Sequence, residues 1–266
     1  MIKLENVSKV YGFGDATTLA LDDVSLHVEK GEFVAIMGPS GSGKSTLMNM
    51  IGLLDRPSQG TYLLGSKNVS KLRSNARAKV RRDKIGFIFQ SFNLLPRLTV
   101  LENVCLPLLY KGVSSFSRIK LGTEILQKVG LENRSFYLAN QLSGGQMQRV
   151  TIARALINKP GIIIADEPTG NLDTASSEAI MELLKEIHKG GNTIIMDTHN
   201  PDLTAHAGRV VYMRDGRIHQ DKDLKENELA DITKLHNAPS EIDKLLSNKS
   251  SKHQKNKRQL KKASKK

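Results

Sequence analysis

The stretch FVAIMGPSGSGKSTLMNMI, residues 33–51, decides what kind of fold this chain forms. Its first five residues are apolar, as in a buried strand, and Leu47, Met50 and Ile51 then recur at helical spacing. Between them lie three glycines, a proline and two serines. Glycines let main-chain N–H groups converge, and a helix N-terminus adds free N–H groups and the positive end of its dipole. The segment therefore predicts a strand, a phosphate-binding loop and a helix.

The loop also has the spacing of a nucleotide-binding P-loop, because Gly38 is followed after four residues by Gly43, Lys44 and Ser45. In that pattern the lysine reaches the β- and γ-phosphates, and the hydroxyl after it ligates Mg²⁺. A glycine-rich turn that binds nothing is the alternative, but strand, loop and helix all agree with the pattern. The residues expected to contact ATP here are Gly38, Pro39, Ser40, Gly41, Ser42, Gly43, Lys44, Ser45 and Thr46.

The composition is that of a globular chain with one strongly basic end. Of the 266 residues, 39% are hydrophobic and 25% are charged, which is ordinary for a soluble domain. Residues 244–266 hold nine lysines and one arginine with no acid, so we expect this tail to be disordered. The one cysteine, Cys105, excludes an intramolecular disulfide and indicates a reducing compartment. The start of the chain lacks the apolar core of a secretory signal, and no apolar run approaches the roughly 20 residues of a membrane span.

Strand and helix patterns alternate along the chain, which predicts an α/β domain with a mainly parallel sheet. Strand-like apolar runs occur at 24–28, 33–37, 85–89, 161–165, 193–197 and 209–213. Helical patterns occur near 99–110, 117–129, 145–158 and 176–188. Because strand patterns are missing between Gln90 and Pro160, we expect an inserted helical lobe over about 91–160. The main domain is expected to span 1–220, with a weakly helical extension at 221–243 ahead of the tail.

A second segment with phosphate-binding chemistry lies inside this lobe, where residues 142–150 read LSGGQMQRV. Ser143 and two glycines open a helix in which Met147, Val150 and Ala153 repeat at helical spacing. The loop has no lysine of its own, so it forms at most half of a nucleotide site. It would complete a site held by a second chain in a two-fold pair. An ordinary N-capped helix is the alternative for this loop taken alone.

Four motifs together resemble the nucleotide-binding subunit of ABC transporters: GPSGSGKST, Gln90 after IGFIF, LSGGQ, and IIIADEP. The resemblance implies the ABC ATPase fold, with a P-loop core, an antiparallel β portion and an inserted helical lobe. It also implies that the signature loop, Ser143, Gly144, Gly145 and Gln146, clasps the γ-phosphate across a homodimer. Asp166 is similar to the aspartate that holds Mg²⁺, together with Ser45 and Gln90, and Glu167 is similar to the catalytic glutamate.

Three further positions match the family's motifs individually. His199 follows the strand TIIMD and matches the switch histidine, which contacts the γ-phosphate and orients the attacking water. With Glu167 and Lys44 it completes the expected catalytic group. Asp173 matches the loop that couples the two sites of the dimer, and Tyr11 matches the aromatic residue that stacks on adenine. For Tyr11, simple packing after the first strand is the alternative.

The resemblance further implies a partner permease and a location on the cytoplasmic face of the cell membrane. Within the family the chain is similar to the ATPases of macrolide-efflux and lipoprotein-release systems. The resemblance therefore implies an ATP-hydrolysing subunit of a transporter or of a mechanotransmission complex, with export of the drug, peptide or lipoprotein type. An accessory periplasmic or extracellular protein can join through the permease. Phe92, Leu94 and Leu95, after Gln90, are candidates for the docking surface, with packing inside the lobe as the alternative. Asn200, where an aspartate is common, and the lysine tail depart from the family pattern.

Two other functions fit part of the sequence. The basic tail would suit a soluble ABC ATPase acting on ribosomes or nucleic acid, but such proteins generally fuse two nucleotide domains, and this chain has one P-loop and one LSGGQ. A module that uses ATP only as a dimer clamp would not need Glu167 and His199. The tail itself is expected either to contact anionic lipid or to remain solvated.

Overall fold

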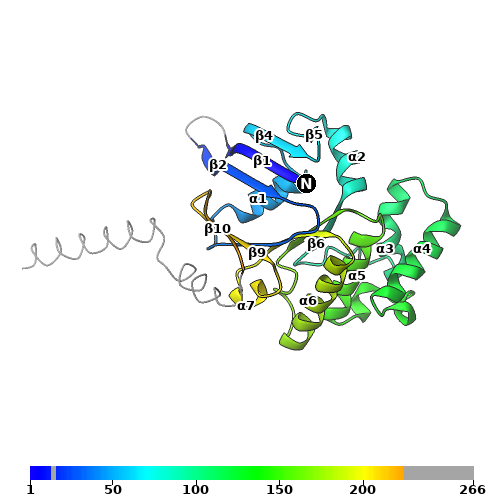
Figure 1. The fold of residues 1–266 in the computed structure, drawn as a ribbon. Coiled ribbons are helices and arrows are strands. Elements are labelled where there is room, and N and C mark those ends of the chain that lie inside the picture. The colour runs from blue at the N-terminus through cyan, green and yellow to red at the C-terminus, as the bar shows by residue number, and fades with distance from the viewer. Residues whose placement is uncertain (13–15, 225–266) are drawn as a thin grey trace, which may run out of the picture. The chain divides into compact units, whose positions relative to one another are not determined.

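The computed structural model describes residues 1–12 and 16–224 (Figure 1). The tail at 244–266 and most of the expected extension at 221–243 lie outside these described residues. The strands are β1 (Ile2–Tyr11), β2 (Thr18–Val28), β3 (Phe33–Met37), β4 (Gln59–Leu64), β5 (Lys67–Asn68), β6 (Ile85–Phe89), β7 (Ile162–Asp166), β8 (Thr193–Asp197), β9 (Arg209–Arg214) and β10 (Arg217–Asp223). The helices are α1 (Lys44–Ile51), α2 (Ser74–Lys84), α3 (Val100–Tyr110), α4 (Ser115–Lys128), α5 (Gly144–Leu156), α6 (Thr174–Lys189) and α7 (Pro201–Thr204), with short 3-10 turns η1 (Glu132–Arg134) and η2 (Ala139–Gln141).

Two sheets organise the described residues. The six-stranded sheet has the order β10-β9-β3-β8-β7-β6, in which every neighbouring pair is parallel except β10 with β9. The second sheet, β2-β1-β4-β5, is antiparallel throughout. The expected fold class is confirmed: an α/β core with a mainly parallel sheet, an antiparallel portion and inserted helices.

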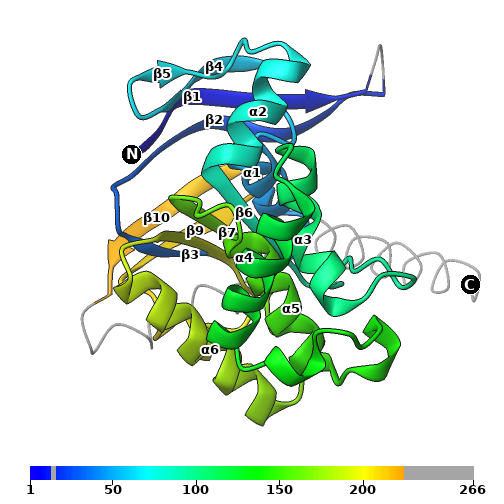
Figure 2. The same ribbon diagram turned by 90° about the vertical axis from the view of Figure 1, so that its right-hand side faces the viewer.

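The main core lies between the two sheets and is filled by α1 (Figures 1 and 2). Leu47, Met50 and Ile51 of this helix are fully buried against both sheets, which explains their helical spacing in the sequence. Helix α6 lies on the opposite side of the parallel sheet from α1 (Figure 2). Strands of the parallel sheet are thus covered on both faces, and for this reason they read as unbroken apolar runs.

Helices α3, α4 and α5 form the expected helical lobe between β6 and β7. Helix α3 starts at a capping box, in which the Thr99 side chain accepts from Glu102 N and the Glu102 carboxylate accepts from Thr99 N at 2.8 Å. Helix α2 was not expected from the sequence. Only Ala76, Ala78 and Val80 are apolar among its residues SNARAKVRRDK, and none of the eleven is fully buried, so no apolar stripe marks it.

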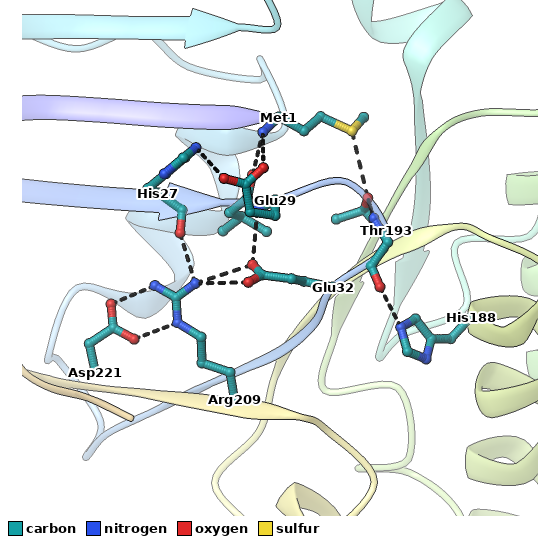
Figure 3. A network of polar contacts seen from close by, with 10 residues as sticks. Met1, His27, Glu29, Glu32, His188, Thr193, Arg209 and Asp221 are labelled. Atoms are coloured by element: carbon teal, nitrogen blue, oxygen red, sulfur yellow. Dashed lines mark hydrogen bonds and ion pairs between the residues drawn. The ribbon is translucent and has the colours of Figure 1, made fainter. Parts of the chain in front are cut away.

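A polar network ties the antiparallel sheet to the parallel one at the end opposite the P-loop (Figure 3). The Arg209 guanidinium of β9 donates to the His27 carbonyl at 2.9 Å and to the Glu32 carboxylate at 3.1 Å. It also forms a bidentate pair with Asp221 of β10, at 2.6 and 2.7 Å. Arg209 therefore links the end of β2 and the start of β3 to β9 and β10. This link holds the start of β3, the strand that leads into the P-loop.

Candidate active site

The P-loop connects β3 to α1 and has a backbone that only glycine fits at two positions. Gly38 has φ +151°, and a Cβ there would lie 2.1 Å from the Met213 carbonyl oxygen. Gly43 has φ +97°, and a Cβ there would lie 2.6 Å from the Ala20 carbonyl oxygen. Helix α1 then begins at Lys44 with no side-chain cap and no acid in its first turn. Its first N–H groups are therefore left for an anion rather than for the chain itself.

Lys44 is buried inside this loop. Its Nζ donates to the Gly38 carbonyl at 2.9 Å and to the Pro39 carbonyl at 3.1 Å. The ammonium also lowers the pKa of Asp166 and of Asp197, against the effect of their burial. Lys44 is thus the cation that faces the carboxylates at the neighbouring strand ends.

Those carboxylates lie at the carboxyl ends of β7 and β8, where ligands bind in open α/β sheets. Asp166 and Asp197 are directly paired residues of the two parallel strands. Burial raises the pKa of Asp166, and the adjacent Glu167 adds to the shift. Burial also raises the pKa of Asp197 to about 7, with Asp166 and Glu167 adding to it. The site therefore gathers three acids beside one lysine.

Glu167 and His199 form a direct pair. Nδ1 of His199 lies 3.0 Å from Oε1 of Glu167, although the residues are 32 positions apart in the chain. Glu167 has φ +42°, a strained conformation for a non-glycine residue, and its N–H donates to the Asp197 carbonyl at 3.1 Å. The His199 side chain is 62% exposed while that of Glu167 is 25% exposed, so the histidine lies on the open side of the pair. This arrangement suits a carboxylate that positions water and a histidine that orients it.

Gln90 lies close to the same carboxylate. A Cβ on Gly170 would come within 2.6 Å of Gln90 Nε2 and 3.2 Å of Glu167 Oε2, so both side chains pack against this glycine. Asn171 donates to the Gln90 carbonyl at 3.0 Å and fixes the end of β6. The structure therefore brings Gln90 to the pair Glu167 and His199.

The signature loop lies apart from the P-loop and next to the start of α6. Ser143 caps α5 through a box with Gln146, at 3.3 and 3.0 Å. A Cβ on Gly145 would lie 3.0 Å from the Ser176 hydroxyl, and Ser176 in turn donates to Asp173, the N-cap of α6, at 2.7 Å. Across the described ranges, no hydrogen bond joins residues 143–146 to Lys44 or Asp166. One chain thus keeps its two phosphate-binding loops separate.

Tyr11 is held at the edge of the site by residues that the motifs do not mark. Its hydroxyl donates to Asp55 at 2.9 Å, and Lys9 Nζ binds the other Asp55 oxygen at 2.7 Å. The Lys9 ammonium lies 4.8 Å from the Tyr11 ring centroid. Burial raises the pKa of Tyr11, Asp55 adds to the rise, and the hydroxyl of Thr46 beside the P-loop opposes it. Tyr11 is 41% exposed, so it is accessible to a flat ligand.

Two side chains of α5 anchor the loops around the site, and sequence reasoning missed both. Gln148 is fully buried, and its Nε2 donates to the Pro168 carbonyl, directly after Glu167, at 2.6 Å. Arg154 donates to the carbonyls of Phe92 and Asn93 at 2.8 and 2.6 Å. Each is a polar residue at a position of α5 that faces the protein interior. Helical spacing alone does not distinguish such a position from an exposed one.

The residues present fit a divalent cation bound with nucleotide. Mg²⁺ is usually held by one or two carboxylates together with substrate phosphates. Asp166 would supply a carboxylate oxygen, Ser45 a hydroxyl oxygen and Gln90 an amide oxygen. In the described part of the chain, no group of three or more His, Cys, Asp or Glu side chains is arranged to hold a metal. A cation here would thus take its other ligands from phosphate and water.

Comparisons with known proteins agree with this geometry. Residues 21–170 match the family model of the ABC transporter. The chain is 54% identical over 218 residues to the ABC transporter ATP-binding protein YvrO of Bacillus subtilis, covering 82% of this chain and 95% of that protein. It is 49% identical to the macrolide export ATP-binding/permease protein MacB of Chlorobaculum tepidum, covering 86% of this chain but 35% of that longer protein.

The solved structures that match include the cassette MJ0796 of Methanocaldococcus jannaschii. A dimeric post-hydrolysis state of that cassette, bound to ADP and Pi, aligns with a TM-score of 0.78 at 46% identity and covers 85% of this chain and 99% of the other. Among the described residues, no helix combines the length and apolar character needed to cross a bilayer. The chain therefore belongs to the ABC transporter family, as an ATP-binding subunit with the ABC ATPase fold and ATPase activity.

Proposed function

We propose that this chain closes as a homodimer around two ATP molecules and thereby drives a partner permease. The observation that carries the proposal is the separation of its two phosphate-binding loops. The P-loop lies with Asp166 and Glu167, whereas the Ser143 loop lies beside Asp173 and has no lysine of its own. A head-to-tail pair would unite each P-loop with the partner's signature loop. The dimers formed by MJ0796 support this arrangement.

The chemistry we infer is attack of water on the γ-phosphorus, with cleavage of the bond to the β,γ-bridging oxygen, giving ADP and Pi. Lys44 and the amide groups of both loops stabilise negative charge on the phosphoryl group as it transfers. Glu167 holds or deprotonates the water, and His199 orients it. Mg²⁺, held by Ser45, Asp166 and Gln90, supplies further charge neutralisation when bound. Tyr11 offers its open ring face to adenine.

A groove beside the helical lobe supports a permease partner. It has a volume of about 1000 Å³ and is lined by α2, β6, α3 and α5, with the exposed Tyr110 among its lining residues. Arg154 and Asn93 also line it, and they are bonded to each other. A helix or loop seated there would therefore touch the turn that follows Gln90. Of the expected docking residues, Leu95 is 48% exposed while Phe92 and Leu94 are half-buried.

We place the chain on the cytoplasmic face of the cell membrane, bound there through the permease. The name of MacB describes macrolide export and joins the ATP-binding and permease parts in one protein. We infer an export role for a drug, peptide or lipoprotein, with an accessory protein reached through the permease. The macrolide export in the name of MacB supports the drug among these substrates. A soluble ATPase acting on ribosomes is the alternative, and the similarity to MacB, which contains a permease part, favours the membrane partner over it.

Mixing two inactive variants tests the shared site. Ser143→Arg blocks the signature loop, and Lys44→Ala disables the P-loop. A heterodimer of the two contains one intact composite site, so a mixture should regain ATPase activity that neither variant has alone. Cross-linking in the same sample verifies that heterodimers form. A mixture that stays inactive while heterodimers are present means either that the two loops do not share a site or that both sites of the dimer must act together.

Co-purification tests the permease. The chain, tagged in its native cell, should be recovered with an integral membrane protein from detergent-extracted membranes. Replacing Ala78 or Leu106 by Arg would add a long cationic side chain to the groove. Either substitution should release that partner while ATP binding is retained. Recovery with ribosomes instead would support the alternative.

A further inference from the structure

Asp197 is the feature of the site that neither the motifs nor the proposed chemistry uses. It ends β8, and the residue after next, His199, carries the expected switch function. The Asp197 side chain is 2% exposed. Its Oδ1 is buried and has no hydrogen-bond partner among the described residues. A buried carboxylate oxygen without a hydrogen-bond partner lowers the stability of the fold. We therefore expect a ligand to supply the missing partner.

The position of Asp197 in the sheet directs it toward the nucleotide site. It pairs in register with Asp166 on the neighbouring parallel strand, and paired residues of adjacent strands project to the same face. Lys44, Glu167 and His199 all act electrostatically on its carboxylate. The unpartnered oxygen therefore shares the surroundings of Asp166, beside the P-loop lysine.

The local charge is unbalanced. Asp166, Glu167 and Asp197 face one another across two strand ends, and Lys44 is the buried cation close to them. The Lys44 ammonium is already bonded to the carbonyls of Gly38 and Pro39. A divalent cation carried with the nucleotide would offset the negative charge that these three neighbouring acids carry when ionised, and its bound water would give the orphaned oxygen a partner.

We propose that Asp197 is a second acid of the divalent-cation site, acting beside Asp166. This inference rests on the proposed nucleotide site and adds to it a residue that the family motifs do not mark. Acids that support a metal through its ligands or bound water typically change metal affinity by about 10- to 100-fold when removed. Asp197 should therefore set how strongly cation and nucleotide bind together, and it should have little effect on nucleotide bound without metal.

The test measures binding in the full chain without turnover. ADP affinity is determined by calorimetry in EDTA and again in Mn²⁺, and Mn²⁺ occupancy with saturating ADP is followed by electron paramagnetic resonance. Asp197→Asn keeps the shape of the side chain and removes its charge. Glu124→Gln, an exposed acid of α4, is the matched control. Thermal melts in EDTA verify folding.

We expect Asp197→Asn to lower Mn²⁺ affinity at least about tenfold while ADP affinity in EDTA stays within about twofold. The control should match the wild-type chain in both measurements. Equal Mn²⁺ affinity in wild type and variant overturns the assignment of Asp197 alone. Failure of the wild-type chain to bind ADP at all overturns the nucleotide site as well, so the two failures are distinct.

A second variant covers the case in which Asp197→Asn folds poorly. Asp197→Ser is smaller and leaves room for water at the same position. It is subject to the same comparison, with Mn²⁺ affinity lowered and metal-free ADP affinity kept as the expected result. A purely structural role for Asp197 predicts instead that ADP affinity in EDTA and in Mn²⁺ fall together, and that outcome overturns the proposal.

Discussion

Replacing Gln148 by Met would test whether α5 holds the Glu167 carboxylate in place. Methionine has a similar length, so the change removes hydrogen bonding with little change in volume. The Pro168 carbonyl would lose its 2.6 Å bond, and the Thr151 hydroxyl would lose one of its two contacts with Gln148. Both groups lie in the core, so water cannot readily replace the lost donor.

The size of the effect follows from these contacts. A buried carbonyl left without a partner costs about 1–3 kcal/mol. For a domain of this size that lowers Tm by about 2–4 °C for each kcal/mol. Pro168 follows Glu167, whose φ of +42° is strained. Without the bond from Gln148, we expect the backbone of this turn to shift toward a less strained conformation and to displace the Glu167 carboxylate. About 1.4 kcal/mol lost from the transition state corresponds to a tenfold lower rate.

The assay compares melting temperature, ATP affinity and kcat. We expect Gln148→Met to lower kcat about tenfold and Tm by several degrees, with ATP affinity within about twofold, because the P-loop is untouched. Gln127→Met, an exposed glutamine of α4, is the control and should change none of the three. A lower Tm with normal kcat would show that Gln148 only stabilises the fold. No change in either would refute the reasoning altogether.

Three further outcomes are expected. Glu167→Gln should bind ATP but lose about 10²–10⁴-fold in turnover and accumulate as a dimer in sedimentation with Mg-ATP, and retention of more than a tenth of the rate would contradict its role. Lys44→Ala should weaken binding of a fluorescent ATP analogue, and unchanged affinity with unchanged hydrolysis would reject the P-loop assignment. A chain ending at Asp243 should keep its ATPase activity yet float less well with anionic vesicles at low salt, because it lacks the ten basic residues of the tail. Equal flotation of both chains would leave the tail without a membrane role.

The central strands could be predicted from sequence because they are buried on both faces. The apolar runs at 33–37, 85–89 and 193–197 coincide with β3, β6 and β8. Strands β4 and β10 alternate or are largely exposed, and short polar runs of that kind resemble loops. Only their pairing with β1 and β9 makes them strands, and pairing across the chain is invisible to local pattern.

The site residues likewise fall into those that local sequence predicts and those that depend on contacts between distant segments. Residues that act through backbone geometry, such as Gly38 and Gly43, follow from spacing, because the phosphate-binding loop is a local structure. Asp197 could not be singled out, since it reads as the polar end of the strand TIIMD and its significance comes from Asp166 on a neighbouring strand. Asp55, which orients Tyr11, lies 44 residues away from it in the chain. Such contacts exist only once the sheets are assembled.

Helix α5 explains how strained turns around the site persist. Glu167, Phe92 and Asn93 all have positive φ without being glycine, which costs about 1–3 kcal/mol each and needs support from the surrounding structure. The turn after Glu167 is held by Gln148, and the turn at Phe92 and Asn93 is held by Arg154. The same helix begins at the signature residue Ser143. Because a helix moves as a rigid body, any displacement of its N-terminus acts on both turns. Through them it acts on the Glu167 carboxylate and on the groove lined by Asn93 and Arg154.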